Sequence, residues 1–428
     1  MNQGRRSVLG LALLGAVQPV LGAGRGGKAH AALEQELAAI AQDPACELAS
    51  LSVLAIRNGQ VSYEGQFGRR SIGPDRPADA HTLYRIASVS KMMATLGLLR
   101  LLEAGKVDLD GDVSRHLGFS LRNPHFPDRI ITLRTLLTHT SSLRDDAGYS
   151  FGADVALKDM LVSGDVKMWA ANAAPGAYFS YCNLGWGVIG TVMEAVTGER
   201  FDRLMRRLLL DPLGLQGGYN PSAFAPAELA NVATLYRKRT VDTEIWDPSG
   251  PWIAQADDVI HKPPAPPPGI ERYVIGTNAT PFSPTGGLRI SARGLGTVMR
   301  MLLQGGVHAG SRLLKPATLD QMFSRQWTYD GANGDTLDGF YQAWGLGNQQ
   351  FPHEPVTHGD LAGHQGDAYG LVSAFLLDRT RRNGMVMLVG GTSTDPFTPA
   401  NRGAQSAMPR FQERIMTVLQ RRAILVRA

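Results

Sequence analysis

The stretch Ser88-Val89-Ser90-Lys91 decides how this sequence of 428 residues is interpreted. It separates an extended, partly apolar segment at 82–87 from a strongly helical one at 92–102. A serine and a lysine three residues apart on a helix lie on the same face. The first turn of a helix also carries unpaired N–H groups and a positive field. The pattern therefore predicts a nucleophilic hydroxyl with a base one turn away, although a capping serine followed by a surface lysine would give the same letters.

The overall composition indicates a soluble globular protein without a nucleic-acid partner. The chain is 43% hydrophobic and 19% charged, and it is long enough for two or three cores. Its formal charge is +5, but four basic residues and no acidic one lie in the first 31 positions, so the remainder carries only +1. No basic patch interleaved with aromatic residues occurs in that remainder, and we expect no nucleic-acid binding.

Residues 1–31 are typical of an export signal. Arg5 and Arg6 stand shortly before a short apolar run at 11–17, which resembles a twin-arginine signal. Neither this run nor any later one reaches the ~20 apolar residues that a membrane-spanning helix needs. We therefore expect an exported, periplasmic protein with no integral membrane segment after signal removal. Cleavage is expected after Ala31 or earlier, near Ala23; an ordinary basic tail is the alternative.

The two cysteines give no sign of a cofactor or metal site. Cys46 falls in an early loop and Cys182 falls inside a motif described below. An exported protein can pair two cysteines, but these positions favour free thiols. No cysteine spacing fits zinc, and no cofactor is expected.

The secondary-structure pattern predicts an α/β (α+β) fold with an antiparallel sheet flanked by helices. Asn58-Gly59 and residues 382–384 are hairpin signals between apolar runs. Because strands stand at both ends of the chain, one sheet is expected to form from both termini, with a mostly helical domain inserted between them. The domains are 1–31, then 32–115 with 285–428, and the insertion 116–284. Helices are predicted at 31–41, 88–105, 133–137, 186–196, 201–209, 292–303 and 405–419, and strands at 51–56, 61–67, 371–377 and 385–389.

Residues 240–284 are expected to form a long loop. Five prolines between 263 and 268 exclude regular helix or central strand there. Trp246 and Trp252 offer apolar surface for the mouth of a cleft. We expect the loop to border the site and control substrate choice, with a plain connector as the alternative.

Two short motifs supply further chemistry. Tyr181-Cys182-Asn183 precedes an apolar helix; tyrosine transfers protons and asparagine orients amides, although Asn183 also reads as a helix cap. Gly363-His364-Gln365-Gly366 precedes a buried strand, and its glycines allow a ligand to approach the backbone. His364 adds a donor or a titratable charge, with a hairpin turn and a surface histidine as the alternative.

The order of these motifs resembles the serine β-lactamase and penicillin-binding-protein superfamily, in its class C-like branch. That branch includes class C β-lactamases, D-alanyl-D-alanine carboxypeptidases, D-aminopeptidases and β-lactamase-fold esterases. The resemblance covers roughly residues 45–395 and implies a β-lactamase/transpeptidase-like fold. It rests on five elements in the family order: Arg85-Ile86-Ala87-Ser88-Val89-Ser90-Lys91, Leu136-Leu137-Thr138-His139-Thr140-Ser141-Ser142-Leu143, Tyr181-Cys182-Asn183-Leu184-Gly185-Trp186, Pro284-Thr285-Gly286-Gly287-Leu288 and Gly363-His364-Gln365-Gly366.

The resemblance implies a role for each matching residue. Ser88 corresponds to the nucleophile and Lys91 to its activating base, which must lose its proton despite a reference pKa of ~10.4. Tyr181 corresponds to the tyrosine that passes a proton to the leaving group. Asn183 corresponds to the residue that holds the lysine and the substrate amide.

The third motif implies the oxyanion hole, and it departs from the family pattern. His364 takes the place of the usual lysine and Gly366 matches the glycine that follows. The hole is then formed by the backbone N–H groups of Ser88 and Asp367. Histidine is only partly charged near neutral pH, so it is a weaker partner for a β-lactam carboxylate. Ser142 also replaces a usual glycine, which we interpret as a tolerated loop change.

These features favour a serine hydrolase that forms an acyl-enzyme on Ser88 and acts on a small ester or amide. A β-lactamase or D-alanyl-D-alanine carboxypeptidase, acting on β-lactams or cell-wall peptides, is the alternative enzyme. A non-catalytic penicillin sensor on the same fold is a third hypothesis. A metallohydrolase using His358, Asp360 and His364 is disfavoured, because a glycine-rich turn is a poor platform for rigid ligands. The oligomeric state stays open.

Overall fold

The computed structural model describes residues 27–354, 356–357 and 359–425. The predicted export signal therefore lies outside the described residues, apart from its last five positions. No helix within the described residues is long and apolar enough to cross a membrane.

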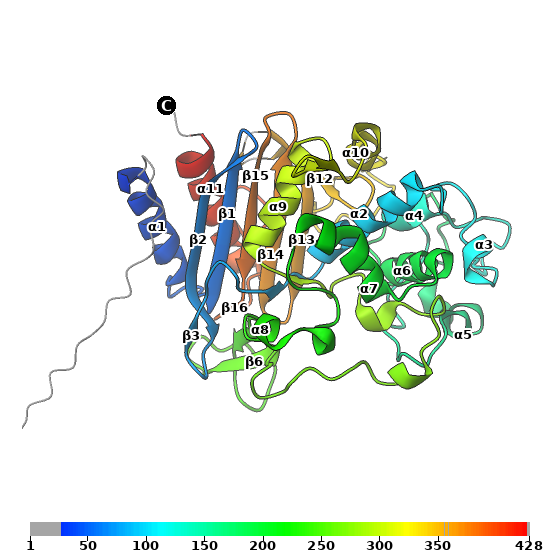
Figure 1. Cartoon of the computed structure of the whole chain (residues 1–428), viewed down its shortest axis with the longest axis horizontal. Helices are drawn as coiled ribbons and strands as arrows, with labels where there is room; N and C mark the ends of the chain where they lie inside the picture. The colour runs from blue at the N-terminus through cyan, green and yellow to red at the C-terminus, as the bar shows by residue number, and fades with distance from the viewer. Residues whose placement is uncertain (1–26, 355, 358, 426–428) are drawn as a thin grey trace, which may run out of the picture.

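A nine-stranded sheet forms one side of the molecule, and helices gather beside it (Figure 1). Every neighbouring pair in it is antiparallel. Strands from both ends of the chain meet at its centre, where Leu51 lies opposite Val389. This confirms the predicted fold class. In spatial order the strands are β10 (Trp327–Thr328), β11 (Ala343–Trp344), β12 (Gln349–Glu354), β13 (Gly359–Ala368), β14 (Leu371–Asp378), β15 (Asn383–Val389), β1 (Ser50–Arg57), β2 (Gln60–Ser71) and β3 (Arg76–Pro77).

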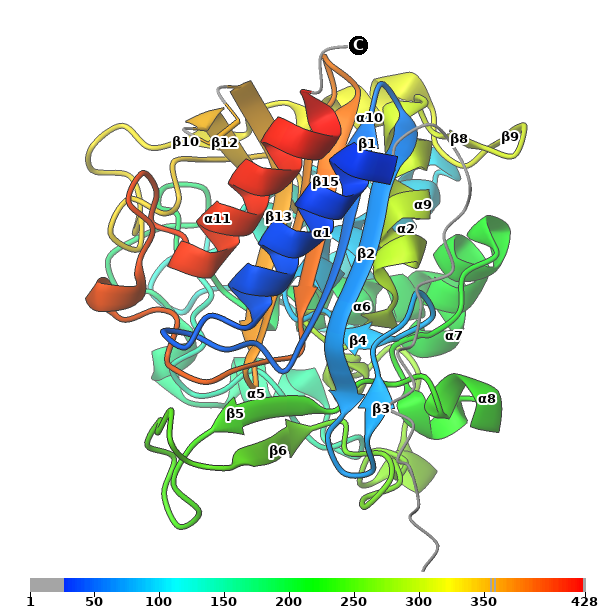
Figure 2. The same cartoon turned by 90° about the vertical axis from the view of Figure 1, so that its left-hand side faces the viewer.

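Both faces of the sheet are covered, which explains the continuous apolar runs in the central strands. Successive side chains of a strand point to opposite faces. Leu51 and Val53 of β1 join one hydrophobic cluster, whereas Leu54 and Ile56 join the other. The first cluster lies under two helices that run side by side across one face (Figure 2). These are α1 (Gly27–Ala41) and α11 (Arg410–Leu419).

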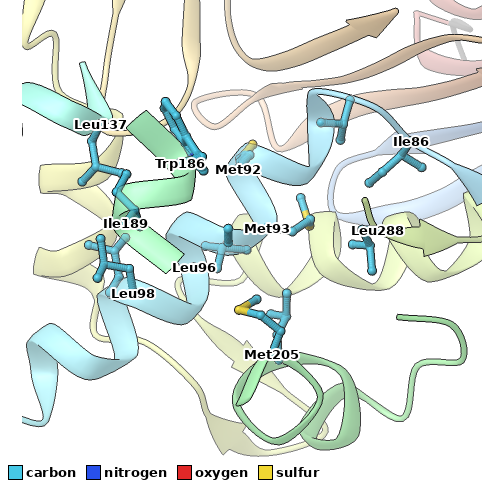
Figure 3. Packing of buried hydrophobic residues seen from close by; sticks show 14 of the residues in the cluster. Ile86, Met92, Met93, Leu96, Leu98, Leu137, Trp186, Ile189, Met205 and Leu288 are labelled. Carbon is cyan, nitrogen blue, oxygen red and sulfur yellow. The ribbon is translucent and has the colours of Figure 1, made fainter. Parts of the chain in front are cut away.

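The second cluster extends from the sheet into the helical region and surrounds α2 (Val89–Glu103). Twelve of its fifteen residues are buried, and the exceptions, Arg100, Leu102 and Glu103, lie at its C-terminal end. Met92, Met93 and Leu96 pack among side chains of several other elements, including Trp186 and Met205 (Figure 3). The remaining helices are α3 (Ser114–Leu117), α4 (Leu133–Leu137), α5 (Leu157–Val162), α6 (Leu184–Thr197), α7 (Phe201–Met205), α8 (Pro226–Leu229), α9 (Ala292–Leu303) and α10 (Pro316–Phe323).

Three small sheets complete the fold and correct one expectation. The segment 240–284 is not a loop throughout, because it contains β6 (Trp252–Ala256). This strand pairs with β5 (Leu235–Lys238), which pairs in turn with β16 (Gly391–Thr392). The rings of Trp246 and Trp252 lie against Arg237 and Lys238 of β5. The other small sheets pair β4 (Tyr84–Arg85) with β7 (Arg289–Ile290) and β8 (Val307–His308) with β9 (Ser311–Arg312).

Several predicted helix boundaries differ from the structure, including the start of the first helix, which is Gly27 rather than residue 31. The last helix begins at Arg410 rather than at 405, because the Glu413 carboxylate accepts hydrogen bonds from the backbone N–H groups of Ala404 and Gln405 and holds them in a loop. The predicted helix 201–209 changes into a π-helical turn at Arg206–Leu210. The division of the chain at 115/116 and 284/285 stays a prediction.

Candidate active site

Ser88 stands at the N-terminus of the buried helix α2, as predicted. It is half-buried and occupies the N-cap position, following Ala87 in the left-handed conformation at φ +45°. The preceding strand β4 is held against the segment around Leu288, whose carbonyl accepts from Ile86 N–H at 2.9 Å. This sharp turn between strand and helix presents the Ser88 hydroxyl at the start of α2, where the N–H groups of Val89 and Ser90 donate to the Ile86 and Ala87 carbonyls of the turn itself.

Lys91 is fully buried, and its ammonium nitrogen contacts three oxygen atoms. The Nζ atom lies 3.1 Å from Ser88 Oγ, 2.7 Å from Asn183 Oδ1 and 3.1 Å from the Thr285 carbonyl oxygen. Burial lowers the pKa of Lys91 to about 7, while Asp145 opposes that shift. A neutral lysine has two N–H donors and one lone pair. It can therefore donate to the Asn183 and Thr285 oxygens and accept the Ser88 proton.

Asn183 is fixed from both ends of its side-chain amide. Its Oδ1 also accepts from the Thr285 hydroxyl at 2.7 Å, and its Nδ2 donates to the Asp145 carboxylate at 2.9 Å. Asp145 accepts in addition from the backbone N–H groups of Asn183 and Leu184 at the start of α6. A carboxylate at a helix N-terminus is favourably placed. Asp145 thereby sets the orientation of the amide that faces Lys91.

Tyr181 places its hydroxyl group against Ser88 by stacking between two rings. His139 stacks on one side at 4.3 Å between ring centroids, and Tyr341 stacks in parallel at 5.4 Å. The His139 Nδ1 atom accepts from the Cys182 N–H at 2.9 Å. Burial raises the pKa of Tyr181 well above its usual value, with Tyr341 adding to the shift and a hydrogen bond with Ser88 opposing it. Tyr181 is therefore a neutral phenol that can relay a proton.

The second half of β13 runs past Ser88 at very close range. An added Cβ atom on Gly366 would lie 2.8 Å from both the Ser88 nitrogen and the Ile86 carbonyl oxygen. Gly366 therefore permits this approach because it has no side chain. Partner strand β12 pairs only with the first half of β13, Gly359 to Gly363, on that edge. The Asp367 backbone follows Gly366 directly, beside the N–H of Ser88.

His364 is 2% exposed and is neutral, which corrects the expectation of partial charge near neutral pH. Burial lowers its pKa to about 3, and Lys91 adds to the shift. The Nδ1 atom lies 2.6 Å from the Gln365 carbonyl oxygen, so Nδ1 carries the proton and Nε2 is an acceptor. The His364 ring packs at the edge of Trp344. Position 364 therefore carries no fixed cation.

Three residues that hold the site had no role predicted from the sequence. Asp145 lies in a loop with no sequence signal beyond its acidic character. Thr285 and His139 belong to motifs that the resemblance had singled out, so position in a motif was the available signal. Ser142, the departure from glycine, adopts φ +67° and accepts a hydrogen bond from Asn123. That left-handed conformation explains why glycine is usual there.

Within the described residues, the structure does not bring together the members of the alternative metal site. His358 lies outside the described residues. Asp360 and His364 are four residues apart on β13, roughly 13 Å at strand spacing, which is too far for one metal ion. No group of three or more histidine, cysteine, aspartate or glutamate side chains in the described part of the chain is placed to hold a metal. Cys46 and Cys182 are free thiols.

Comparison with known proteins agrees with this geometry. Residues 31–407 match the family model described as Beta-lactamase, and the chain belongs to this family, within the superfamily of serine β-lactamases and penicillin-binding proteins. The chain is 31% identical to Esterase EstB of Burkholderia gladioli over 198 residues, covering 43% of this chain and 49% of the esterase. The match thus spans about half the length of this curated relative.

Solved structures share the fold. The octameric penicillin-binding protein homologue from Pyrococcus abyssi superposes with a TM-score of 0.62 at 20% identity, covering 92% of this chain and 77% of that one. A class C β-lactamase in complex with cefoxitin superposes with a TM-score of 0.65 at 15% identity, covering 92% and 98%. The proteins that it resembles include an esterase, a D-stereospecific amidohydrolase and class C β-lactamases.

Proposed function

We propose that the protein forms an acyl-enzyme on Ser88 and hydrolyses small carboxylic esters or amides. The observation that carries the proposal is the contact between Lys91 Nζ and Ser88 Oγ inside a fully buried environment. Such an environment disfavours the ammonium form and leaves the lysine ready to accept a proton. The stacked, neutral Tyr181 stands against the same hydroxyl.

The reaction begins when Ser88 Oγ attacks the carbonyl carbon and its proton passes to Lys91. The carbonyl oxygen becomes an oxyanion that the backbone N–H groups of Ser88 and Asp367 stabilise. The C–O or C–N bond to the leaving group then breaks as Tyr181 donates a proton, which Lys91 replaces. Water attacks the acyl-enzyme in the same way and returns Ser88 with release of the acid.

Esters and amides without a free carboxylate beside the scissile bond suit this site best. The neutral His364 supports this preference because it lacks the cation that a lysine would offer. The similarity to a protein named as an esterase points the same way. The shared fold still supports the alternative of a β-lactamase or D-alanyl-D-alanine carboxypeptidase. The lack of a permanent charge at position 364 counts against that alternative.

Comparing p-nitrophenyl butyrate with nitrocefin, each with wild type and with Ser88→Ala, tests the proposal. We expect ester hydrolysis that Ser88→Ala abolishes and slow or undetectable nitrocefin turnover. Nitrocefin turnover comparable to ester turnover would favour the β-lactamase alternative. A Ser88→Ala protein that keeps a tenth of the wild-type activity would refute the nucleophile.

We also propose export to the periplasm by the twin-arginine route. The Arg5-Arg6 pair before a short apolar run supports it. Replacing both arginines by lysine should trap precursor inside the cell. Unchanged export of that variant would show that the pair is not the signal.

A further inference from the structure

Arg85 lies three residues before Ser88 and carries a charge that the described residues leave unpaired. Its Nε atom donates to the Gly286 carbonyl at 3.2 Å, and its guanidinium lies 4.9 Å from the centre of the Tyr369 ring. Neither of its η nitrogens has a hydrogen-bond or ion-pair partner within the described part of the chain. Its neighbour Arg289 on β7, in contrast, pairs through two nitrogens with Asp257, at 2.6 and 3.1 Å.

The surroundings of Arg85 are unfavourable for an unpaired cation. Burial lowers its pKa, and the charge of Arg289 adds to the effect, while Asp257, Tyr369 and Tyr149 oppose it. A partly buried charge without a counterion is costly. Among the described residues, the two η nitrogens of Arg85 are not fully enclosed, so they keep contact with solvent. A reachable, unpaired guanidinium in this setting is suited to receive an anion.

The position of Arg85 ties it to the site around Ser88. Arg85 and Ser88 are three residues apart, so their Cα atoms are separated by at most about 11 Å. Tyr369 follows the oxyanion-hole residue Asp367 by two positions, and Tyr149 follows Asp145 by four. His364 lies five residues before Tyr369 on the same strand and turn, roughly 16 Å away at strand spacing. Arg85 and His364 therefore belong to different elements near the reacting centre, β4 and β13.

Two exposed aromatic rings complete this region. Tyr149 is 43% exposed and Tyr369 is 44% exposed, and both lie close enough to Arg85 to influence its charge. Such rings provide apolar surface for a short carbon chain. A guanidinium with two free η nitrogens matches the planar geometry of a carboxylate.

We propose that Arg85, Tyr149 and Tyr369 form a subsite that binds a carboxylate at the far end of the substrate's acyl chain. The inference rests on the proposed hydrolase function and names its substrate class: half-esters or half-amides of short dicarboxylic acids. The anion is then recognised by Arg85 rather than by the neutral His364.

A matched pair of substrates tests the subsite. One is the 4-nitrophenyl ester of glutaric acid with its second carboxyl free; the other carries that carboxyl as a methyl ester. Wild type should prefer the free acid, by kcat/KM, at low ionic strength. Arg85→Gln should lower the ratio of the two kcat/KM values at least tenfold, whereas Arg57→Gln, at the β1–β2 turn, should keep the wild-type ratio. Arg85→Lys should give an intermediate ratio, and an unfolding scan of each variant checks that it is folded.

Binding without turnover separates this proposal from the proposed chemistry. In Ser88→Ala protein, calorimetry should show tighter binding of the free-acid ester than of the methyl-capped one, and the added Arg85→Gln change should remove the difference. The affinity measurement remains informative even if neither ester is hydrolysed. A lack of hydrolysis would count against the proposed hydrolase function but not against the subsite. An equal ratio in wild type and Arg85→Gln, or equal affinities of the two esters for Ser88→Ala protein, would overturn the subsite.

Discussion

Lys91 Nζ lies 3.1 Å from Ser88 Oγ in a position from which water is excluded. The same nitrogen is held by the Asn183 side-chain oxygen and the Thr285 carbonyl oxygen. These two acceptors use both N–H donors of a neutral amine. The remaining lone pair is directed at the serine, and this relationship determines the predictions below.

The activity should rise with pH through about 7, where Lys91 loses its proton. The base works only when neutral, so kcat/KM should fall up to tenfold for each pH unit below that value. His364, with its pKa lowered to about 3, stays neutral across this range. Burial raises the pKa of Asp367 to about 6, so Asp367→Asn is the control, and the rising limb should persist in it. A kcat/KM that is flat between pH 5 and 8 in a stopped-flow or buffer-series measurement would contradict the role of Lys91.

Asp145→Asn should reduce both activity and stability. The carboxylate accepts from two backbone N–H groups and from the Asn183 amide, and an amide oxygen replaces these charge-assisted bonds poorly. We expect a loss of about 1–3 kcal/mol in the free energy of unfolding and a lower kcat with little change in KM. The neighbouring exposed Asp146→Asn is the matched control. Wild-type kcat in Asp145→Asn would show that Asn183 is oriented without it.

Gly366→Ala should disable the oxyanion hole while the sheet stays folded. The added methyl group would lie 2.8 Å from the Ser88 nitrogen and 2.6 Å from Ser373 Oγ, which forces β13 away from Ser88. Loss of an oxyanion donor costs roughly a hundred- to a thousand-fold in kcat. Gly185→Ala, where the new atom meets only Leu136 at 3.7 Å or more, serves as the comparison. Activity of Gly366→Ala within threefold of wild type, with an unchanged circular dichroism spectrum, would contradict the close approach.

Tyr181→Phe should separate proton transfer from ring packing. The change removes the hydroxyl beside Ser88 and keeps the stack between His139 and Tyr341. We expect a decrease in kcat of roughly a hundred- to ten-thousand-fold with a thermal midpoint close to that of wild type. Tyr341→Phe, which changes the adjacent ring in the same way, is the control. An active Tyr181→Phe protein would leave Lys91 as the sole proton carrier.

The sequence was sufficient for those parts of the fold and site that depend on local pattern. Asn58-Gly59 marked the central hairpin, and the strongly helical stretch after Ser88 marked the helix that carries the nucleophile. The start of the last helix was missed because Glu413 binds the preceding backbone N–H groups, a contact that helix propensity does not encode. β6 was missed because its partner, β5, lies outside the proline-rich segment that contains it.

The site was harder to predict where the chain brings distant loops together. Ser88 and Lys91 are neighbours on one turn, so spacing alone paired them. Asp145 acts through Asn183, 38 residues later, and no local pattern links the two. The protonation state of His364 depends on its burial beside Trp344 and on the nearby charge of Lys91. The identity of the residue alone does not reveal such surroundings. Arg85 belongs to a motif that the sequence analysis named. Only the structure shows that Arg85 has no ion-pair partner among the described residues, whereas Arg289 pairs with Asp257.

Peptide-level mass spectrometry of rapidly quenched protein tests the central claim most directly. The enzyme is mixed with p-nitrophenyl butyrate, with a penicillin or with a fluorophosphonate, quenched in acid and digested. For the ester and for the fluorophosphonate, the account predicts one butyryl or phosphonyl adduct per chain, located on Ser88. The Ser88→Ala protein should carry no such adduct. Ester turnover with an adduct on another residue, or with full activity in Ser88→Ala, would contradict it.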